Sequence, residues 1–529
     1  MNTESGKEHQ LIKPEVDNLL ILCDEAMRAT PENVKRFIEP APGVLAQSKA
    51  KQHSIIFGRR GSGKSSLLRK VVADLTLDRR PISFVDMETF KGHSYPDVLI
   101  SVLIKSLQEF EKWLSTAATT SAKSSRFWLK FWGNKPERKP FNKVKTAEIT
   151  QELKRIIIDL NERLSQPETV SVHQKKGNEK ILNASLSGNI KSSVASISGD
   201  VLASEKNTSD FQQEYQSHKT EYLHQNILRF QHFFTELGEL SDGPSYLILD
   251  DLYHIRRSDQ AKVIDYFHRI AKGNNLWLKI GTIKHRSDWY IHTDPPIGVK
   301  LGDDAKEINI DISLEKFSIL RDFMRKILSN LMDETPPLSV TGLLNASAIE
   351  RLIIASGGVT RDFIGIFAKS VNQARNRGVR HHRGPKIGAE DVNLATGEYG
   401  ESKREEFKLD ANEDRIALEE SFQKLVDFCI NKSKCNIFLI PLRRNENESE
   451  YGAIDQLIDL RLVHLVQSRV TLKTGAEGKI FQAYMLDTSE YVASRKVHGF
   501  TIIDLNSKTF GEDIRKAKLV YNPVREQLL

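Results

Sequence analysis

One stretch of the chain combines glycines, a lysine and hydroxyl side chains at a spacing that suits phosphate groups. The segment GRRGSGKSS contains the full pattern Gly-x-x-x-x-Gly-Lys-Ser, known as Walker A. Its glycines let backbone N–H groups and the start of the next helix point at an anion. Lys64 would add a positive charge, and the Ser65 hydroxyl would ligate Mg²⁺. The residues expected to bind the nucleotide are Gly58, Arg59, Arg60, Gly61, Ser62, Gly63, Lys64, Ser65 and Ser66.

A pair of carboxylates, Asp250 and Asp251, follows a second apolar segment, the run YLIL at residues 246–249. A strand that ends in an acid places the carboxylate at the carboxyl edge of a parallel sheet, where open α/β proteins bind ligands. There Asp250 would hold Mg²⁺, mostly through water, and Asp251 would orient or deprotonate the attacking water. An acidic turn without chemistry is the alternative. With the glycine-rich loop, the pair predicts binding of ATP and Mg²⁺.

Both segments need a sheet to position them, and the surrounding pattern predicts one. The apolar run Ser54–Phe57 precedes the glycine-rich loop, and helical spacing follows the loop. Further strands are expected at residues 82–87, 246–249, 276–282 and 307–312, with helical segments between them. Strands that alternate with helices imply a parallel sheet covered on both faces. The fold class is therefore α/β, with the three-layer parallel sheet of a P-loop NTPase.

The chain of 529 residues is long enough for several domains. One interval is far longer than a usual crossover and is interpreted as an insertion. A polar stretch at residues 384–408 is interpreted as a linker, and the later order of helix, strand, helix and two strands matches a winged helix. The expected units are an N-terminal helical segment (1–50), a P-loop base (51–312) with an insertion (115–210), a helical lid (313–400), a winged-helix domain (410–492) and a C-terminal tail (493–529).

The net charge of +7, from 77 basic and 70 acidic residues, comes from one segment. Residues 121–145 contain eight basic residues and one acid, so the rest of the chain is neutral overall. Phe127, Trp128, Phe131 and Trp132 lie there at a spacing that places them on one helical face. Such a face would pack on the protein's own sheet, grip nucleic acid or a partner protein, or lie in an anionic membrane interface. Membrane association is the least favoured of these.

Several other classes of protein are disfavoured. No run approaches the roughly 18 apolar residues of a membrane-spanning helix, and the N-terminus MNTESGKEHQ is too polar for a secretory signal. Cys23, Cys429 and Cys435 form no C-x-x-C pair, which fits a reducing cytosol and predicts a cytoplasmic protein. His381 and His382 have no further metal ligands beside them, so zinc is not expected.

With both motifs placed, the sequence resembles the AAA+ ATPases, most of all the branch of origin-recognition-complex-like initiators and transposition regulators. The resemblance runs from about residue 54 to residue 492 and implies a helical lid and two sensor residues. Thr282, at the end of the fourth strand, would be sensor 1 and face the γ-phosphate or the attacking water. Arg361, in SGGVTRDFIGIF, would be the sensor-2 arginine that couples the lid to the nucleotide. An ordinary strand threonine and a solvated arginine are the alternatives.

Two features depart from this family pattern. The second motif reads Asp-Asp, where most AAA+ motors have Asp-Glu, and the shorter acid would slow hydrolysis. Signalling ATPases of the STAND type often share this acidic pair. An arginine finger, which would act on a neighbouring subunit's nucleotide, is not obvious; Arg286 is the first candidate, with Arg256 and Arg257 behind it.

The predicted winged helix favours protein contacts at least as much as DNA contacts. Its helix at residues 450–462 carries three acids and one arginine, and phosphates would repel such a helix from the major groove. DNA contact through the wing remains open. The charged residues concerned are Glu450, Asp455, Asp459 and Arg461 on the helix, and Arg469, Lys473 and Lys479 on the wing.

These features predict a Mg²⁺-dependent, ATP-hydrolysing AAA+-type regulator. Its nucleotide state would control assembly into a homo-oligomer and engagement of DNA or a protein partner or effector, and the resemblance implies a bacterial defence or mobile-element system. The alternative is a STAND-like switch that holds ATP or ADP as a latch with little turnover. A small-molecule kinase is disfavoured, because no substrate-pocket pattern accompanies the P-loop.

Overall fold

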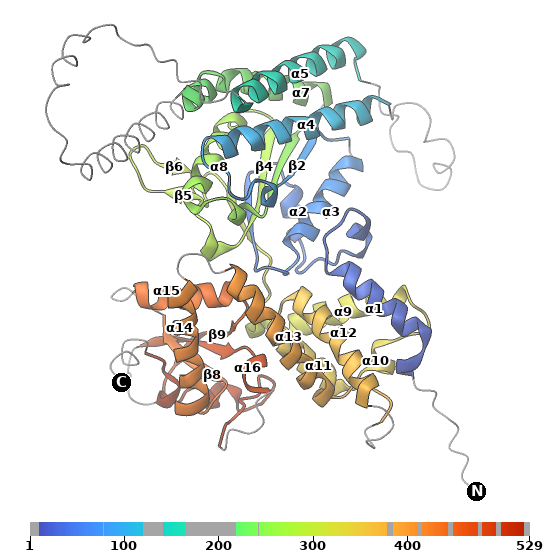
Figure 1. Ribbon diagram of the computed structural model, residues 1–529, viewed down its shortest axis with the longest axis vertical. Helices are drawn as coiled ribbons and strands as arrows, with labels where there is room; N and C mark the ends of the chain where they lie inside the picture. Colours follow the sequence, from blue (N-terminus) through green and yellow to red (C-terminus); the bar gives the residue numbers. More distant parts are fainter. Residues whose placement is uncertain are drawn as a thin grey trace, which may run out of the picture.

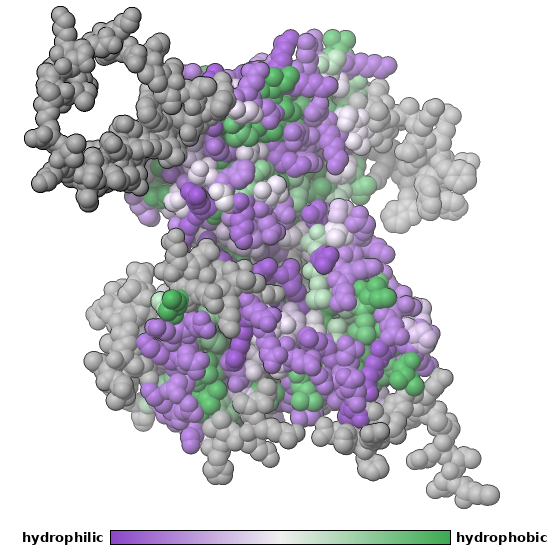
Figure 2. Space-filling model, viewed as in Figure 1, coloured by the Kyte–Doolittle hydropathy of each residue, from purple (hydrophilic) through white to green (hydrophobic). Residues whose placement is uncertain are grey.

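The computed structural model describes residues 10–77, 79–119, 141–165, 218–241, 243–377, 384–410, 415–442, 448–473, 479–492 and 499–522. Figure 1 shows a sheet with its covering helices in the upper part of the molecule, above a helical lid and a C-terminal domain that lie side by side. The face seen in Figure 2 is mainly hydrophilic, and its hydrophobic residues are scattered. No helix in the described part of the chain is long and apolar enough to span a bilayer.

A parallel sheet forms the centre of the upper part. Its strands, as far as the chain is described, lie in the order β2-β3-β4-β1-β7, and each neighbouring pair is parallel. The expected α/β fold class is confirmed, and the strands lie where the apolar runs predicted them. Their bounds are β1 Ser54–Phe57, β2 Ile82–Asp86, β3 Ser245–Asp250, β4 Leu276–Thr282 and β7 Lys306–Asn309.

Helices cover both faces of the sheet because the central strands bury side chains on each side. On one face, Leu67, Leu68 and Val71 of α3 pack against Ile56 and Ile248. The other face carries α4, α7 and α8, and α5 packs outside α4 and α7. The bounds are α2 Val44–Lys49, α3 Lys64–Leu77, α4 Asp97–Thr119, α5 Lys143–Ser165, α7 Ile227–Ser241 and α8 Arg257–Ala271.

The described parts of the expected insertion form an additional helical layer. Helix α5 buries Ile149, Leu153, Ile156 and Leu160, which are the apolar positions of its amphipathic pattern. Residues 121–140 of the basic aromatic segment at 121–145 lie outside the described residues. The stretch from 166 to 217 is outside them as well.

Short elements follow the carboxyl ends of the strands. The loop after β4 forms η5 and then a small antiparallel hairpin of β5 and β6, which packs on α8. Their bounds are η3 Met87–Phe90, η4 Leu252–His254, η5 Lys284–Arg286, β5 Tyr290–Ile291 and β6 Ile297–Gly298.

Helices occupy the segment that the sequence analysis assigns to a lid, and the N-terminal segment packs on them. Val16, Leu19 and Cys23 of α1 share a core with Leu320 of α9 and Phe367 of α12. The bounds are η1 Gln10–Ile12, α1 Pro14–Ala26, η2 Glu32–Arg36, η6 Leu314–Lys316, α9 Phe317–Asp333, α10 Val340–Leu343, α11 Ala346–Ala355 and α12 Thr360–Arg377.

The interpretation of residues 384–408 as a linker is wrong. A helix, α13 (Ala389–Asp410), occupies most of this stretch and packs on α11 and α12. The sequence pattern does not indicate this helix, because part of the buried face of the helix is polar. Asp391 and Lys403 are buried together with Val392 and Ala395. A buried helix face that pairs charges does not show the apolar periodicity on which sequence prediction depends.

The C-terminal domain has the element order that the sequence predicts. Its antiparallel sheet has the order β8-β10-β9, and residues 499–522 pack on it, burying Ile514, Leu519 and Tyr521. That this domain is a winged helix stays a prediction. The bounds are α14 Arg415–Asp427, η7 Phe428–Lys432, β8 Ile437–Pro441, α15 Glu448–Asp459, β9 Val463–Thr471, β10 Ile480–Leu486, α16 Ser489–Val492, α17 Phe510–Asp513 and η8 Ala517–Leu519.

Candidate nucleotide-binding site

The glycine-rich loop connects β1 to the N-terminus of α3 and has the backbone that its glycines permit. Gly61 and Gly63 have φ angles of +82° and +100°, in the left-handed region that glycine adopts readily. Gly58 is packed so closely that a Cβ atom there would lie 2.7 Å from Cγ1 of Ile310. The loop is tied to β4 because the Gly58 N–H donates to the Thr282 carbonyl at 3.3 Å. Its backbone N–H groups and the helix N-terminus can therefore face an anion.

Lys64 stands at the first position of α3 and is buried. Its Nζ lies 3.6 Å from Oδ1 of Asp251 and 5.8 Å from the centroid of the Tyr253 ring. Asp251 follows β3 with a φ of +53°, and this left-handed turn directs the chain into η4. The lysine of the first motif and an acid of the second are thus in direct electrostatic contact.

Asp250 ends β3 and is almost fully buried. A Cβ atom at position 281 would lie 2.7 Å from Oδ1 of Asp250, so the glycine in β4 makes room for this carboxylate. Burial, followed by the repulsion of Asp251, raises the pKa of Asp250 to about 7, while Lys64 and a hydrogen bond with Ser65 act in the opposite direction. Hydroxyl and carboxylate oxygens are the ligands that Mg²⁺ prefers, so Ser65 and Asp250 fit a magnesium ion.

A cavity of about 470 Å³ brings the two motifs together with the lid and the N-terminal segment. This volume is in the usual range for small-molecule sites. The cavity is lined by Ala26, Met27, Arg28, Ala29, Arg60, Gly61, Gly63, Lys64, Ser65, Ser66, Arg69, Asp86, Glu88, Asp250, Asp251, Tyr253, His254, Thr360, Arg361 and Ile364. Residues far apart in the sequence therefore form one polar site at the carboxyl edge of the sheet.

The two expected sensor residues differ in their position relative to the cavity. Arg361, in the first turn of α12, lines the cavity, and its N–H donates to the Gly61 carbonyl at 3.1 Å. Thr282 is absent from the described lining of the cavity, and its hydroxyl lies 2.5 Å from that of Ser287. The structure therefore brings Arg361 together with the two motifs, whereas Thr282 contributes its carbonyl to the loop.

Arg59 and Arg60 are neighbours in the loop but lie on different sides of it. Arg60 lines the cavity. The buried guanidinium of Arg59 is directed to the lid and the C-terminal domain, where Nη2 donates to the Gly357 carbonyl at 3.0 Å and Nη1 lies 3.4 Å from Nδ1 of His464. In this arrangement the side chain of Arg59 therefore points away from the nucleotide cavity and does not fill the binding role expected for it.

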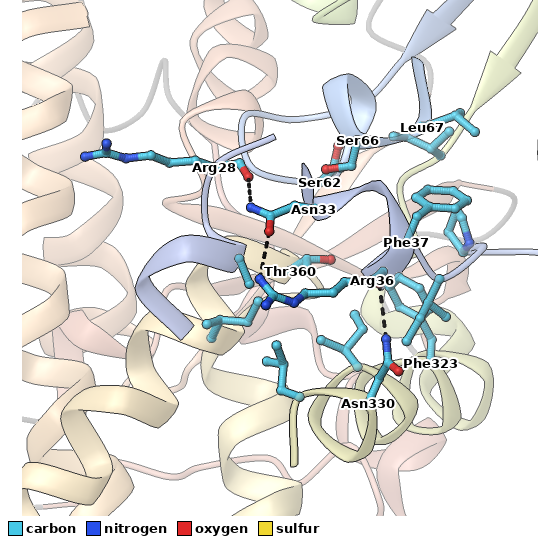
Figure 3. Close-up of a pocket in the computed structure, with 18 residues that line it drawn as sticks. Arg28, Asn33, Arg36, Phe37, Ser62, Ser66, Leu67, Phe323, Asn330 and Thr360 are labelled. Atoms are coloured by element: carbon cyan, nitrogen blue, oxygen red, sulfur yellow. Dashed lines mark hydrogen bonds between the residues drawn. The ribbon is translucent and has the colours of Figure 1, made fainter. Parts of the chain in front are cut away.

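A second, smaller cavity of about 90 Å³ adjoins the first, and the two share Gly63, Ser66 and Thr360 in their linings. Figure 3 shows it between the N-terminal segment and α9, with Phe37 and Phe323 beside it. Much of its lining is apolar and includes Ile310. Such a site suits an aromatic ring.

Polar contacts fix the N-terminal segment around this cavity. The Asn33 amide donates to the Arg28 carbonyl at 3.1 Å and accepts from Arg36 at 2.7 Å, and Asn330 donates to the Arg36 carbonyl at 3.4 Å (Figure 3). The sequence prediction missed residues 26–40 as part of the site. Pro31, Pro40 and Pro42, which mark a non-helical segment just before the first strand, were the available signal.

The three arginine-finger candidates have different surroundings. The Arg286 guanidinium carbon lies 5.5 Å from the Tyr253 ring centroid, beside this chain's own cavity. Arg257 makes a two-point ion pair with Asp288 at 2.9 and 3.0 Å. Arg256 is exposed at the start of α8.

No protein-family model and no curated protein matches this sequence. Among solved structures, a Walker-type ATPase of Pyrococcus abyssi is similar over 85% of this chain and 93% of its own, with 11% identity and a TM-score of 0.40. The ORC1 protein of Aeropyrum pernix, solved in complex with DNA, is similar over 93% of this chain and 94% of its own, with 12% identity and a TM-score of 0.31. Similarity at this level transfers no ligand or partner.

The features that define the fold lie in the chain itself. The glycine-rich loop joins β1 to α3, the strand order is β2-β3-β4-β1-β7, and a helical lid meets the loop at Arg361. Together they make the α/β fold of a P-loop NTPase, with a parallel sheet between two layers of helices.

Proposed function

We propose that this protein is a Mg²⁺-dependent, ATP-binding and ATP-hydrolysing AAA+-type regulator. The observation that carries the proposal is the single cavity in which Lys64, Asp250, Asp251 and Arg361 meet. Four groups from three separate parts of the sequence meet there with the charges that a nucleoside triphosphate and a metal ion need.

The chain's own residues divide the work of binding. Backbone N–H groups of the loop would bind the phosphates, and Lys64 would move from Asp251 to the outer phosphates. Ser65 and Asp250 would hold Mg²⁺, which supplies charge neutralisation when bound. Asp251, released from Lys64, would orient the attacking water, and Arg361 would contact the terminal phosphate from the lid. The small apolar cavity between Phe37 and Phe323 would receive the base.

The regulatory part of the proposal concerns DNA, protein partners and self-assembly. The end of α15 is covered, because the Asp459 carboxylate accepts the His285 N–H at 3.2 Å. In this arrangement α15 faces the P-loop base, which supports protein contact over DNA reading by that helix. Arg469 on β9 is exposed, so the proposal includes a DNA contact through the wing. Homo-oligomer formation and a role in bacterial defence or mobile elements depend on the family resemblance.

A second candidate function is the STAND-like latch with little turnover. The contact between Arg59 of the loop and His464 of the C-terminal domain favours it, because it ties the glycine-rich loop to a separate domain. The two candidates predict the same binding but different turnover.

The test is to measure ATP binding and phosphate release for the wild type, Lys64→Ala and Asp251→Asn. Lys64→Ala is expected to weaken ATP binding at least a hundredfold, and Asp251→Asn to bind ATP but release no phosphate. Lys70→Ala, on the same helix but paired with Asp74 at 2.9 Å, is the matched control. Binding that survives Lys64→Ala contradicts the proposal. Binding without wild-type turnover favours the latch.

A further inference from the structure

Six charged or polar side chains form a buried cluster between the P-loop base, the lid and the C-terminal domain. We call it the interdomain charge cluster. Each of its members is 6% exposed or less. They are Arg59 from the glycine-rich loop, Asp362 from α12, Lys403 from α13, and Arg461, His464 and Asp487 from the C-terminal domain.

One side of the cluster joins the glycine-rich loop to the C-terminal domain. Nη1 of Arg59 lies 3.4 Å from Nδ1 of His464, and Nε2 of His464 lies 2.8 Å from Oδ2 of Asp487. Burial lowers the pKa of His464, so the imidazole is neutral. A neutral ring that donates from Nε2 to the carboxylate can accept from the guanidinium at Nδ1, so both contacts are satisfied by one tautomer.

The other side joins the start of α12 to the C-terminal domain. Asp362 contacts Arg461, and Nζ of Lys403 lies 2.9 Å from both Asp362 and Asp487. Asp362 follows directly after Arg361, the lid residue that lines the nucleotide cavity. Any displacement of the first turn of α12 therefore moves Arg361 and Asp362 together.

The cluster is balanced in charge. Its three cations (Arg59, Lys403 and Arg461) face its two carboxylates (Asp362 and Asp487) around a neutral histidine. Asp311 at the edge of the cluster supplies the third negative charge, with Oδ1 3.5 Å from Nε of Arg59. A buried set of charges is stable only when every member keeps its partner. Withdrawal of the C-terminal domain would separate Asp362 from Arg461 and Arg59 from His464.

From this arrangement we infer that Asp362 and Arg59 are positioning residues, through which the docked C-terminal domain clamps the lid onto the glycine-rich loop and retains the nucleotide. The clamp acts at two points, on Gly357 through Arg59 and on Arg361 through Asp362. It rests on the proposed nucleotide site. Because coupling is reciprocal, a docked domain that tightens nucleotide binding is itself favoured by bound nucleotide. Loosening the domain is expected to speed nucleotide release.

The decisive variant is Asp362→Asn combined with Arg461→Met. It removes one carboxylate and one cation, so Lys403 and Asp487 still pair and no single buried charge is left over. Hydrogen exchange without nucleotide is measured first, at the Arg361 N–H, which reports the contact between lid and loop. We expect exchange at least tenfold faster than in the wild type. Unchanged exchange overturns the clamp whether or not the protein binds ATP.

The second measurement is dissociation of a fluorescent ADP analogue. The double variant is expected to release it at least tenfold faster, while Arg461→Lys, which keeps the charge, stays near the wild-type rate. Arg404→Gln is the matched control, because Arg404 also joins α13 to the C-terminal domain, through Glu490 at 3.0 Å, but does not contact the cluster. Thermal melting identifies any variant that fails to fold. Equal release from all variants overturns the proposal, and wild-type protein that binds no nucleotide contradicts the proposed function instead.

Discussion

Two buried polar regions meet at the adjacent residues Arg361 and Asp362, but their charges are matched differently. In the nucleotide cavity, burial and the neighbouring Asp251 raise the pKa of Asp250 to about 7. In the interdomain charge cluster, burial also opposes the charge of Asp362, but Arg461 and Lys403 outweigh it and lower the pKa. One carboxylate is therefore poorly compensated, and the other is held in its charged form.

The difference separates a site that receives a ligand from a site that holds the fold. A buried carboxylate with a raised pKa gains stability when a cation arrives, so Asp250 is prepared for a metal ion. A carboxylate that already has two cationic partners gains nothing from a third. The first two of three predictions test this contrast, and the third tests the contact between lid and loop beside Arg361.

The largest expected effect is on folding stability. Asp362→Asn removes the buried carboxylate that Arg461 and Lys403 share and is expected to lower the free energy of unfolding by about 3–5 kcal/mol. Asp250→Asn removes a poorly compensated charge and is expected to leave the stability within about 1 kcal/mol of the wild type, or to raise it. Urea unfolding of both variants without nucleotide at pH 7.5 measures the difference. Equal losses of unfolding free energy would show that neighbouring cations compensate the two carboxylates to the same degree.

The second prediction concerns pH. Because the pKa of Asp250 is raised in the folded protein, its protonation stabilises the fold at low pH, and this contribution disappears as the pH rises towards about 7. Burial and Asp311 raise the pKa of Asp459 to about 7, so Asp459 gives the free energy of unfolding a similar pH dependence. The contribution of Asp250 must be separated from that of Asp459. Relative to Asp250→Asn, the wild type is expected to lose on the order of 2–4 kcal/mol between pH 4.5 and 7.5.

The measurement is the free energy of unfolding of wild type and Asp250→Asn across this pH range, since Asp459 contributes equally to both. Mg²⁺-dependent ATP binding should show the reverse trend, because the metal needs the ionised carboxylate, and should weaken below about pH 7. A stability difference that does not vary with pH would mean that Asp250 is compensated like Asp362.

The same contrast explains how much of the site could be read from the sequence. The glycine-rich loop and the strand before Asp250 were predictable, because local spacing alone dictates a phosphate-binding turn and a buried strand. The interdomain charge cluster was not. Asp362 and Lys403 look like solvated helix residues until the fold places them together, and His464 is one residue in an apolar strand. Pairing between side chains that are 23 to 405 residues apart leaves no local pattern.

The N-terminal contribution to the cavity was missed for a related reason. Residues 26–40 contain few regular elements, and their role depends on the position of α9 and α12 against the glycine-rich loop. Arg361 was predicted because it follows a glycine turn in a recognisable lid pattern, whereas the direction of Arg59 depends on Gly357 and His464. Side-chain direction in a loop depends on such distant partners.

The last and smallest prediction concerns Gly61, where the lid touches the loop. A Cβ atom there would lie 2.7 Å from Cβ of Arg361, and its φ of +82° disfavours other residues. Gly61→Ala is expected to lower the free energy of unfolding by about 1–3 kcal/mol and to weaken ATP binding about tenfold, because the lid is pushed from the loop. Gly273→Ala is the matched control, since Gly273 has a φ of +80° but open space around its Cβ position. It should lose about 1 kcal/mol and bind ATP normally. Equal effects on ATP binding would mean that the contact between lid and loop does not shape the site.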